Sequence, residues 1–321
     1  MSIISKDISK AVELLNKEEL VAIPTETVYG LAGNIFSKKA IASIFKTKQR
    51  PKFNPLIVHI PNVEYLDKIV EHIPEKAKAL ANAFWPGPIT LVLKKKASIP
   101  DLITAGKDTV AVRIPNHPVS LKLLRQLEFP LAAPSANPFN RISPTSAQHV
   151  EDYFKDTIKM VLDGGVCKKG IESTIIGFKN EEPIIYRLGS TSIEDIERIV
   201  GKIEIKNRKS KVENPDAPGM LERHYAPKTK TILTNDLSNS IEEFKNQRIG
   251  VLLYNNILND EAIDFKIVLS EDNNLEEAAS KLYDALHQLD KQNLDIIIAE
   301  QLPDYGLGKS INDRLERATK N

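Results

Sequence analysis

The chain of 321 residues has little cysteine and few aromatic residues: a single cysteine, Cys167, one tryptophan and 6% aromatics in all. One cysteine excludes a disulfide within the chain and a metal site built from several cysteines, and it fits a reducing compartment. No apolar run approaches the roughly 18 residues that cross a membrane, and the charged N-terminal stretch lacks the apolar core of a signal peptide. These absences predict a cytoplasmic protein with no membrane partner.

The remaining composition is that of a folded protein, with 41% hydrophobic and 27% charged residues. The length predicts two domains. Charge is divided unevenly: positive charges exceed negative ones by six in residues 1–206 and by two in 207–228, whereas negative charges exceed positive ones by seven in 229–321. A positive excess suits an anionic ligand such as a nucleotide or RNA, although a solvated surface explains so mild an excess more simply.

Hydrophobic patterning predicts an α/β protein, because helical periodicity alternates with short β-branched runs. In residues 1–206 we predict helices at 8–15, 41–45 and 121–127, and strands at 20–23, 56–60, 89–93, 110–114, 158–162, 174–176 and 184–186. Residues 207–228, rich in proline and charge, are typical of a linker. A second, smaller domain follows, with strands at 231–233, 249–254, 267–269 and 294–299 and a helix at 275–289.

Two clusters near the N-terminus could carry chemistry. In Pro24-Thr-Glu-Thr-Val-Tyr-Gly30, two hydroxyls and a carboxylate gather after a strand, although the same residues could simply cap the segment that follows. A basic run comes next, in which Lys46 is explained by a helix C-terminus. Lys48 and Arg50 precede a rigid proline and cannot share one helix face, so together they could grip successive phosphates.

Arg113 ends an otherwise apolar strand, which predicts an acidic neighbour or an anionic substrate opposite it; a carboxylate clamp is the preferred role. Further along, Ser135 and Asn137 precede the pair Ser143-Pro144. That pair is typical of a helix N-cap and first turn, and a helix N-terminus there could also bind a phosphate.

Three further segments give weaker signals. Glycines surround Glu172 and Ser173 and would allow the backbone to approach a ligand closely there. Arg187 follows a strand a little further along. In the linker, cationic and aromatic residues at 218–227 suggest docking onto another surface. The run Gly308-Lys-Ser310 imitates a phosphate-binding loop, but the first glycine of that motif is missing and the surrounding domain is acidic, so we interpret it as the start of a helix.

The inventory lacks a nucleophile and a metal-binding motif. No two histidines are spaced for a shared helix face, no G-x-S-x-G motif occurs, and Cys167 has no histidine near it in sequence. The hydroxyl-rich and cation-rich loops suit phosphoryl or nucleotidyl transfer, in which positioning and charge neutralisation supply most of the rate.

Together these motifs resemble the threonylcarbamoyl-AMP synthase family in its long form. The resemblance rests on PTETVYGL, KQRP, NPLIVHI, FWPGPITLVL, VAVRIP, APSAN, ISPT, DGG, GIEST and PGMLERHYAP, with a weaker match over 306–314. Asn140 and Leu188 depart from the pattern, where glycine and proline are common. The resemblance implies a YrdC-like twisted mixed sheet with flanking helices in 1–206, a linker (207–228) that docks on the active site, and a Rossmann-like α/β domain in 229–321.

The resemblance also implies a reaction: L-threonine, bicarbonate or CO2, and ATP give threonylcarbamoyl-AMP and pyrophosphate, with Mg2+ expected beside the phosphates. The product would pass to a tRNA threonylcarbamoyl transferase for N6-threonylcarbamoyladenosine formation in tRNA, and a weak direct tRNA contact is left as possible. By the same resemblance L-threonine would be held by Thr27, His59, Arg113, Ala133 and Ser173. Lys48 and Arg50 would be catalytic, and ATP would contact Arg50, Asn54, Thr109, Ser135, Ser143, Arg187 and Tyr225.

The residues also allow a second class of function. A tRNA-binding or double-stranded RNA-binding module without catalysis would use the basic first domain. Sparse aromatics and the nucleotide-sized basic clusters argue against it. A relative in hydrogenase maturation shares the YrdC-like domain but carries zinc-binding cysteines, which a chain with one cysteine does not supply.

Overall fold

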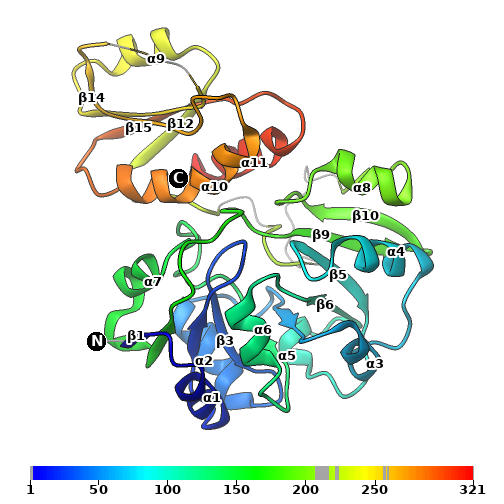
Figure 1. The fold of residues 1–321 in the computed structure, drawn as a ribbon. Coiled ribbons are helices and arrows are strands. Elements are labelled where there is room, and N and C mark those ends of the chain that lie inside the picture. The colour runs from blue at the N-terminus through cyan, green and yellow to red at the C-terminus, as the bar shows by residue number, and fades with distance from the viewer. Residues whose placement is uncertain (1–2, 207–216, 221–223, 256–257, 259, 321) are drawn as a thin grey trace.

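A computed structural model describes residues 3–206, 217–220, 224–255, 258 and 260–320. In this part of the chain a large sheet with its helices forms one unit, and a smaller sheet with three helices forms a second unit above it (Figure 1). The described segments of 217–228 lie between the two units. The mixed α/β class and the second, smaller unit are as predicted from the sequence.

The large sheet has the strand order β1-β8-β2-β3-β7-β4-β6-β5-β9-β10-β11, with parallel and antiparallel pairs mixed. Its strands are β1 (Ile3–Ser5), β2 (Val21–Ile23), β3 (Gly30–Asn34), β4 (Ile57–His59), β5 (Ile89–Lys94), β6 (Thr109–Arg113), β7 (Leu131–Ala132), β8 (Met160–Leu162), β9 (Thr174–Lys179), β10 (Glu182–Arg187) and β11 (Glu204–Ile205). Its helices are α1 (Ile8–Asn16), α2 (Lys38–Lys48), α3 (Leu66–Ile69), α4 (Glu75–Phe84), α5 (Asp101–Thr104), α6 (Pro118–Leu124), α7 (Ala147–Phe154) and α8 (Ile193–Val200), with 3-10 turns at Val63–Tyr65 and Lys155–Thr157.

Each strand predicted in 1–206 is present to within two or three residues, and four further strands were missed. The strand β3 has the sequence GLAGN, which is poor in β-branched residues and was not predicted. Its glycines allow close packing: a Cβ on Gly30 would lie 3.1 Å from the Cβ of Ala133, and one on Gly33 would lie 3.1 Å from Leu20. The segment 30–34 therefore forms a strand between β2 and β7 because its glycines permit tight contacts, and a sequence pattern does not show such contacts.

The predicted helix start at Ser143 is wrong. Helix α7 begins at Ala147, and its N-cap is Ser146, whose side chain accepts a hydrogen bond from the amide of His149. The segment before it is extended because the carbonyl of Pro144 accepts a 2.8 Å hydrogen bond from the amide of Tyr29. The hydroxyl of Ser143 donates to Glu172 instead of capping a helix, at 2.6 Å.

The smaller sheet is entirely parallel, with the order β12-β15-β13-β14. Its strands are β12 (Lys230–Thr234), β13 (Ile249–Leu253), β14 (Ile263–Val268) and β15 (Ile296–Glu300), and its helices are α9 (Leu237–Phe244), α10 (Leu275–Leu289) and α11 (Leu307–Ala318). Helix α10 has the predicted bounds, since one stripe of leucines and alanines is buried and Asn274 caps the first turn.

The Gly308-Lys-Ser310 run lies in the first turn of α11, as the interpretation as a helix start predicted. A Cβ on Gly308 would lie 1.9 Å from the carbonyl oxygen of Pro303, so only glycine fits there. The ammonium of Lys309 lies 3.3 Å from the carboxylate of Glu194 on α8, which links the two units at the surface.

The two units share an apolar core. Val28, Ile142 and Ile171 of the large unit pack with Tyr225 and with the buried faces of α10 and α11. None of the helices in the described residues is long and apolar enough to span a bilayer.

Candidate active site

A recess opens where the ends of several strands of the large sheet meet the segments around Gly219 and Tyr225. It is lined by Thr25, Thr27, Val28, Gly30, Arg50, Ile57, His59, Arg113, Ala133, Pro134, Ser135, Glu172, Ser173, Arg187, Pro218, Gly219, His224 and Tyr225. Nine residues predicted to bind substrates are among them: Thr27, Arg50, His59, Arg113, Ala133, Ser135, Ser173, Arg187 and Tyr225. Residues far apart in sequence therefore gather in one cavity.

Strand pairing places His59 beside Arg113. The parallel strands β4 and β6 align these two residues in register, at the ends of their strands. Arg113 is only 4% exposed and donates from Nη1 to the hydroxyl of Thr27 at 2.9 Å and from Nε to the carbonyl of Gly87 at 3.2 Å. His59 is buried, with no hydrogen-bond partner at Nδ1 in the described residues. Burial, with the nearby Arg113 charge, lowers the pKa of His59 to about 3, so its imidazole is neutral.

The acidic neighbour expected for Arg113 is Glu26. Its carboxylate lies 2.7 Å from Nη2 of Arg113, and both side chains are almost fully buried. The turn that carries Glu26 is held by Thr25, whose hydroxyl donates to the carbonyl of Val28 at 2.6 Å and accepts from the amides of Thr27 and Val28. Thr25 thus caps a turn that leads into β3 and fixes Glu26 against Arg113.

Arg50 and Arg187 form a second cationic wall. Arg50 donates to the carbonyls of Asn54 and Pro55, and Arg187 donates to the carbonyl and hydroxyl of Ser173. Within the part of the chain that the structure describes, neither guanidinium has a carboxylate within 4 Å. Burial and the charge of Arg187 lower the pKa of Arg50 to about 9, and burial also lowers that of Arg187. Glu172 is close enough to Arg187 for each to shift the pKa of the other, but neither arginine has a carboxylate in direct contact among the described residues. Buried cations without a directly bound anion are costly, so this wall is suited to an anionic ligand.

Lys48 and Asn54 flank Arg50 behind the cavity surface. Lys48 is 1% exposed, and its ammonium donates to the carbonyls of Ser135 and Asn137, so it braces the loop that carries Ser135. Burial, together with Arg50, holds the pKa of Lys48 well below its usual value. The amide of Asn54 is fully buried, and neither its nitrogen nor its oxygen has a partner among the described residues. Such an unsatisfied amide is rare and favours a ligand nearby.

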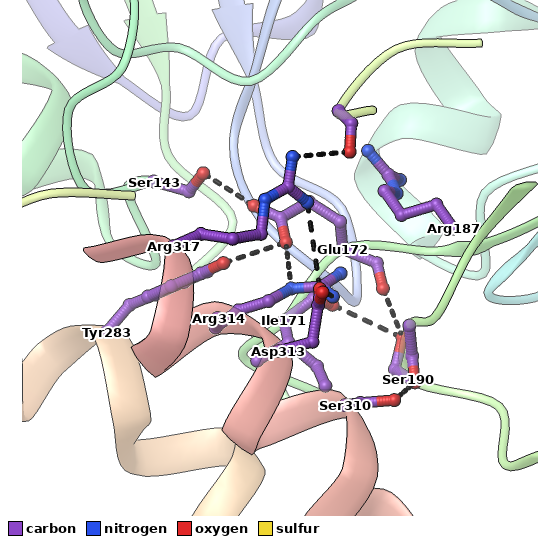
Figure 2. Close-up of polar contacts among 12 residues, drawn as sticks. Ser143, Ile171, Glu172, Arg187, Ser190, Tyr283, Ser310, Asp313, Arg314 and Arg317 are labelled. Atoms are coloured by element: carbon purple, nitrogen blue, oxygen red, sulfur yellow. Dashed lines mark hydrogen bonds and ion pairs between the residues drawn. The ribbon is translucent and has the colours of Figure 1, made fainter. Parts of the chain in front are cut away.

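Glu172 closes the wall next to Ser173. Its carboxylate accepts from the hydroxyl of Ser143 at 2.6 Å and from the hydroxyl of Tyr283 at 2.8 Å, and it pairs with Nε of Arg314 at 3.2 Å (Figure 2). Burial raises the pKa of Glu172, but the charges of Arg314 and Arg187 and these hydrogen bonds outweigh it, so the pKa lies below its ordinary value. The carboxylate is therefore ionised.

The segment around Tyr225 reaches the cavity from between the two units. Tyr225 is fully buried and lines the recess, and its hydroxyl has no hydrogen-bond partner among the described residues. The backbone is anchored by a 2.9 Å hydrogen bond from the amide of Ala226 to the carbonyl of Asn140. Asn140 has φ of +66°, a conformation that glycine favours and asparagine tolerates, which accounts for its departure from the family pattern.

Four predicted residues do not line the recess: Lys48, Asn54, Thr109 and Ser143. Three of them lie just behind it, as described above. Thr109 is at the other end of β6 from Arg113, a strand length of about 13 Å away at 3.3 Å per residue.

The sequence analysis assigned no role to Glu26, Glu172, Pro218, Gly219 or His224, although each lies in a segment that it singled out. It missed Tyr283, Arg314 and Arg317 as neighbours of the site altogether. Glu172 and Arg314 are 142 residues apart, and no local pattern signals a contact at that separation.

A resident metal site is not formed by the described residues, in which no group of three or more His, Cys, Asp or Glu side chains could hold an ion. The two buried carboxylates at the cavity, Glu26 and Glu172, are each paired with an arginine. A divalent cation here would take its ligands mainly from water and from a bound polyphosphate.

Comparisons with known proteins agree on one family. Residues 13–189 match the family model described as telomere recombination, and residues 191–319 match the one described as the threonylcarbamoyl-AMP synthase C-terminal domain. Proteins named threonylcarbamoyl-AMP synthase from Pyrococcus abyssi and Bacillus subtilis are 40% and 39% identical, covering 96% and 97% of this chain and 93% and 92% of their own lengths. A crystal structure of P. abyssi Sua5 complexed with L-threonine has a TM-score of 0.92 and 39% identity, covering 99% of this chain and 98% of that one.

Proposed function

Because the chain belongs to the threonylcarbamoyl-AMP synthase family, we propose that it condenses L-threonine, CO2 supplied by bicarbonate, and ATP into threonylcarbamoyl-AMP and pyrophosphate. Since AMP is transferred from ATP to an acceptor oxygen, the enzyme is a nucleotidyltransferase. The relative crystallised with L-threonine supports threonine as the amino-acid substrate. A recess with a buried cationic wall favours this enzyme over a module that only binds RNA.

The observation that carries the proposal is the wall formed by Arg50 and Arg187. Two buried guanidiniums, close enough for one to lower the pKa of the other and without a carboxylate partner in the described residues, are arranged for a polyanion. A triphosphate would supply the anionic partner that neither guanidinium contacts directly in the described residues. The amide of Asn54, which lies behind Arg50 and has no partner among the described residues, is a further ATP contact in this proposal.

The part of the cavity around Arg113 suits threonine. Arg113 offers a guanidinium to the substrate carboxylate, and Thr27 supplies a hydroxyl beside it. Ser173, whose hydroxyl accepts a hydrogen bond from Arg187, lines the same cavity and is a further threonine contact in this proposal. Glu26 already occupies one face of Arg113, so the substrate carboxylate would share that arginine with Glu26. His59, neutral at physiological pH, can accept a hydrogen bond from the ammonium or hydroxyl of threonine.

In the proposed chemistry the neutral amine of threonine attacks CO2, forms the C–N bond and loses a proton, which leaves a carbamate. A carbamate oxygen then attacks the α-phosphorus of ATP in line, and the bond to the bridging oxygen breaks as pyrophosphate leaves. No protein nucleophile takes part, and burial raises the pKa of the Cys167 thiol, so it stays protonated. The protein contributes positioning and charge neutralisation.

Magnesium enters this proposal as part of the substrate, bound to ATP. The absence of a carboxylate cluster in the described residues fits an ion held by phosphate oxygens and water. Lys48 and Arg50 take the catalytic roles: Arg50 contacts phosphate, and Lys48 holds the Ser135 loop against it. Ala133, Ser135, Ser143, Thr109 and Tyr225 complete the substrate contacts that we propose.

The product is a mixed anhydride of a carbamic acid and a phosphoric acid, which water hydrolyses readily. We therefore propose that a tRNA threonylcarbamoyl transferase consumes it promptly. We also infer the division of the chain into a catalytic domain at 1–206, a docking linker at 207–228 and a C-terminal domain at 229–321. A cytoplasmic location and a weak tRNA contact stay predictions.

The test is pyrophosphate release by the purified chain with Mg-ATP, while threonine and bicarbonate are omitted in turn. Release that requires both, with threonylcarbamoyl-AMP detected by mass, is the expected result. An Arg50→Gln variant should lose most activity, whereas Lys94→Gln, which removes an exposed cation on β5, should retain it. Release that is independent of threonine would contradict the proposal, and so would its absence from a folded sample.

A further inference from the structure

Glu26 and Arg113 form an ion pair at the edge of the recess, and only one of the two faces it. Arg113 lines the recess, as do Thr25 and Thr27, whereas Glu26 between those threonines does not. Glu26 is only 6% exposed. A ligand in the recess would therefore contact Arg113 directly and meet the charge of Glu26 only from behind that arginine.

Both members of the pair are held in place. The backbone carbonyl of Glu26 accepts a 2.7 Å hydrogen bond from the amide of Lys169, and Arg113 is fixed by its hydrogen bonds to Thr27 and Gly87. The Glu26 carboxylate and Nη2 of Arg113 are 2.7 Å apart, yet these atoms make no well-directed hydrogen bond among the described residues. Nη2 therefore keeps a donor for a ligand, while Glu26 stays behind it as a built-in counter-ion.

The pair brings little net charge to this part of the recess. Burial raises the pKa of the nearby Cys167 thiol, the charge of Glu26 raises it further, and the charge of Arg113 lowers it, so the two charges oppose each other there. His59 lines the recess beside Arg113 and is neutral, because burial and the Arg113 charge lower its pKa to about 3. A buried region without net charge suits a ligand without net charge.

We propose that Glu26 is a positioning residue that determines specificity: it compensates the charge of Arg113, so this part of the recess selects a zwitterionic amino acid over a simple carboxylate anion. Arg113 offers the same guanidinium to both ligands. Only the amino acid brings an ammonium group, which offsets the second negative charge placed near Glu26. This inference rests on the proposed function, because it assumes that threonine binds at Arg113.

The same compensation separates the two substrates. Arg50 and Arg187 have no carboxylate in direct contact among the described residues, whereas Arg113 has Glu26. A phosphate group carries more negative charge than a carboxylate and would meet Glu26 without an ammonium to offset it. ATP phosphates are therefore directed to Arg50 and Arg187, and the Arg113 part of the recess stays open for threonine.

The test compares two ligands of matched shape, L-threonine and (R)-3-hydroxybutanoate. The second is threonine without its amine, and it carries one net negative charge. Isothermal titration of the full chain without ATP gives both dissociation constants. We expect the wild type to bind threonine at least about tenfold more tightly, a difference that one uncompensated charge a few ångströms away readily produces.

Two variants of Glu26 separate its charge from its shape. Glu26→Gln removes the charge and should bind (R)-3-hydroxybutanoate at least about tenfold more tightly than the wild type does, which removes the preference for threonine. Glu26→Asp keeps the charge and should keep most of the preference. Asp152→Asn is the matched control, because it removes a carboxylate paired with Lys291 on α7, outside the recess; it should bind both ligands as the wild type does.

The ratio of the two dissociation constants distinguishes this role from a structural one. Circular dichroism and thermal melting establish that each variant is folded, and a merely loosened site would bind both ligands more weakly at an unchanged ratio. The proposal is overturned if Glu26→Gln keeps the wild-type ratio. It is also overturned if the wild type binds both ligands equally well, a comparison that needs no variant and holds even if Glu26→Gln does not fold.

Failure of the proposed function gives a different result. If the wild type binds no threonine and releases no pyrophosphate in its presence, the proposed function fails and the inference about Glu26 fails with it. If the wild type releases pyrophosphate only with threonine but Glu26→Gln keeps the wild-type ratio, the proposed function stands and only the role of Glu26 is overturned.

Discussion

At the scale of single residues, the site is a set of buried charges whose partners differ. Arg113 has Glu26, whereas Arg50 and Arg187 have only carbonyl and hydroxyl oxygens among the described residues. A buried cation that pairs with a protein carboxylate has its charge compensated in the free enzyme. A buried cation without such a pair needs a bound ligand to compensate its charge. This difference is the reason for our proposal that the Arg50 and Arg187 wall binds the more highly charged substrate.

The Glu26–Arg113 pair gives a stability prediction. Arg113→Ala leaves Glu26 as a buried carboxylate without its cation and should lower the free energy of unfolding by about 3–5 kcal/mol. The double variant Glu26→Gln/Arg113→Ala should be less destabilised, because no unpaired charge remains. Urea unfolding at pH 7.5 measures both values, and equal losses in the two variants would show that the pair is not coupled.

The sequence predicted most of the charged residues of the site, but it did not predict which residues they contact. It placed Arg113 at a strand end and expected an anion opposite it, but Glu26 was as easily explained as a capping residue. The amide of Asn54 looked ordinary until its burial was known. Burial and pairing across the fold are set by tertiary packing, and single residues do not encode them.

At the scale of elements, prediction succeeded where local pattern and tertiary packing agree. Helix α10 has the bounds that its apolar stripe and Asn274 cap indicate. Prediction failed for β3, whose glycines are selected by contact with Ala133 and Leu20, and at Ser143, where hydrogen bonds to Glu172 and from Tyr29 to Pro144 replace the helix cap.

The requirement for glycine in the first turn of α11 is tested by Gly308→Ala. The added Cβ would meet the carbonyl oxygen of Pro303 at 1.9 Å, so the helix must shift away from that backbone. We expect a loss of about 1–3 kcal/mol in unfolding free energy, as for other overpacked sites. Thermal melting checks this, and an unchanged melting temperature would show that the contact relaxes without cost.

The Tyr225 segment is tested by substitution of its side chain. Tyr225→Ala removes the ring from the cavity wall and should weaken ATP binding or turnover by about tenfold, the equivalent of about 1.4 kcal/mol. Tyr225→Phe keeps the ring in contact with Tyr283 and Arg314 and should behave closer to the wild type. Steady-state kinetics with varied ATP distinguish them, and unchanged kinetics for Tyr225→Ala would remove this residue from the proposed site.

At the scale of the whole molecule, three buried histidines link stability to pH. Burial, with Arg113 and His149 nearby, lowers the pKa of His59 and that of His287 to about 3, and burial holds that of His224 well below 6.5. Below pH 6.5 the unfolded chain binds protons at these positions that the folded chain does not. The contribution of these histidines to stability should therefore be complete above about pH 6.5 and be lost as the pH drops toward 3.

The free energy of unfolding should change with pH by on the order of 1.4 kcal/mol per pH unit for each such histidine. Urea unfolding between pH 7.5 and 5 measures it in a range above the ordinary pKa of the carboxylates. The variant His287→Asn, which changes one histidine at the contact between α10 and Ser143, should show a shallower dependence. A variant with the wild-type slope would show that His287 binds protons equally in the folded and unfolded chains.

The pairing of Glu172 with Arg314 also sets an order of events during synthesis. These residues are 142 positions apart, and a ribosome that adds about 5–20 residues per second needs roughly 7–28 s to pass from one to the other. During that time the large sheet can fold, yet the Glu172 carboxylate lacks the cation of Arg314, and the Tyr225 ring lacks its contacts with α10 and α11. The nascent enzyme therefore acquires its complete pocket only after α11 has been made.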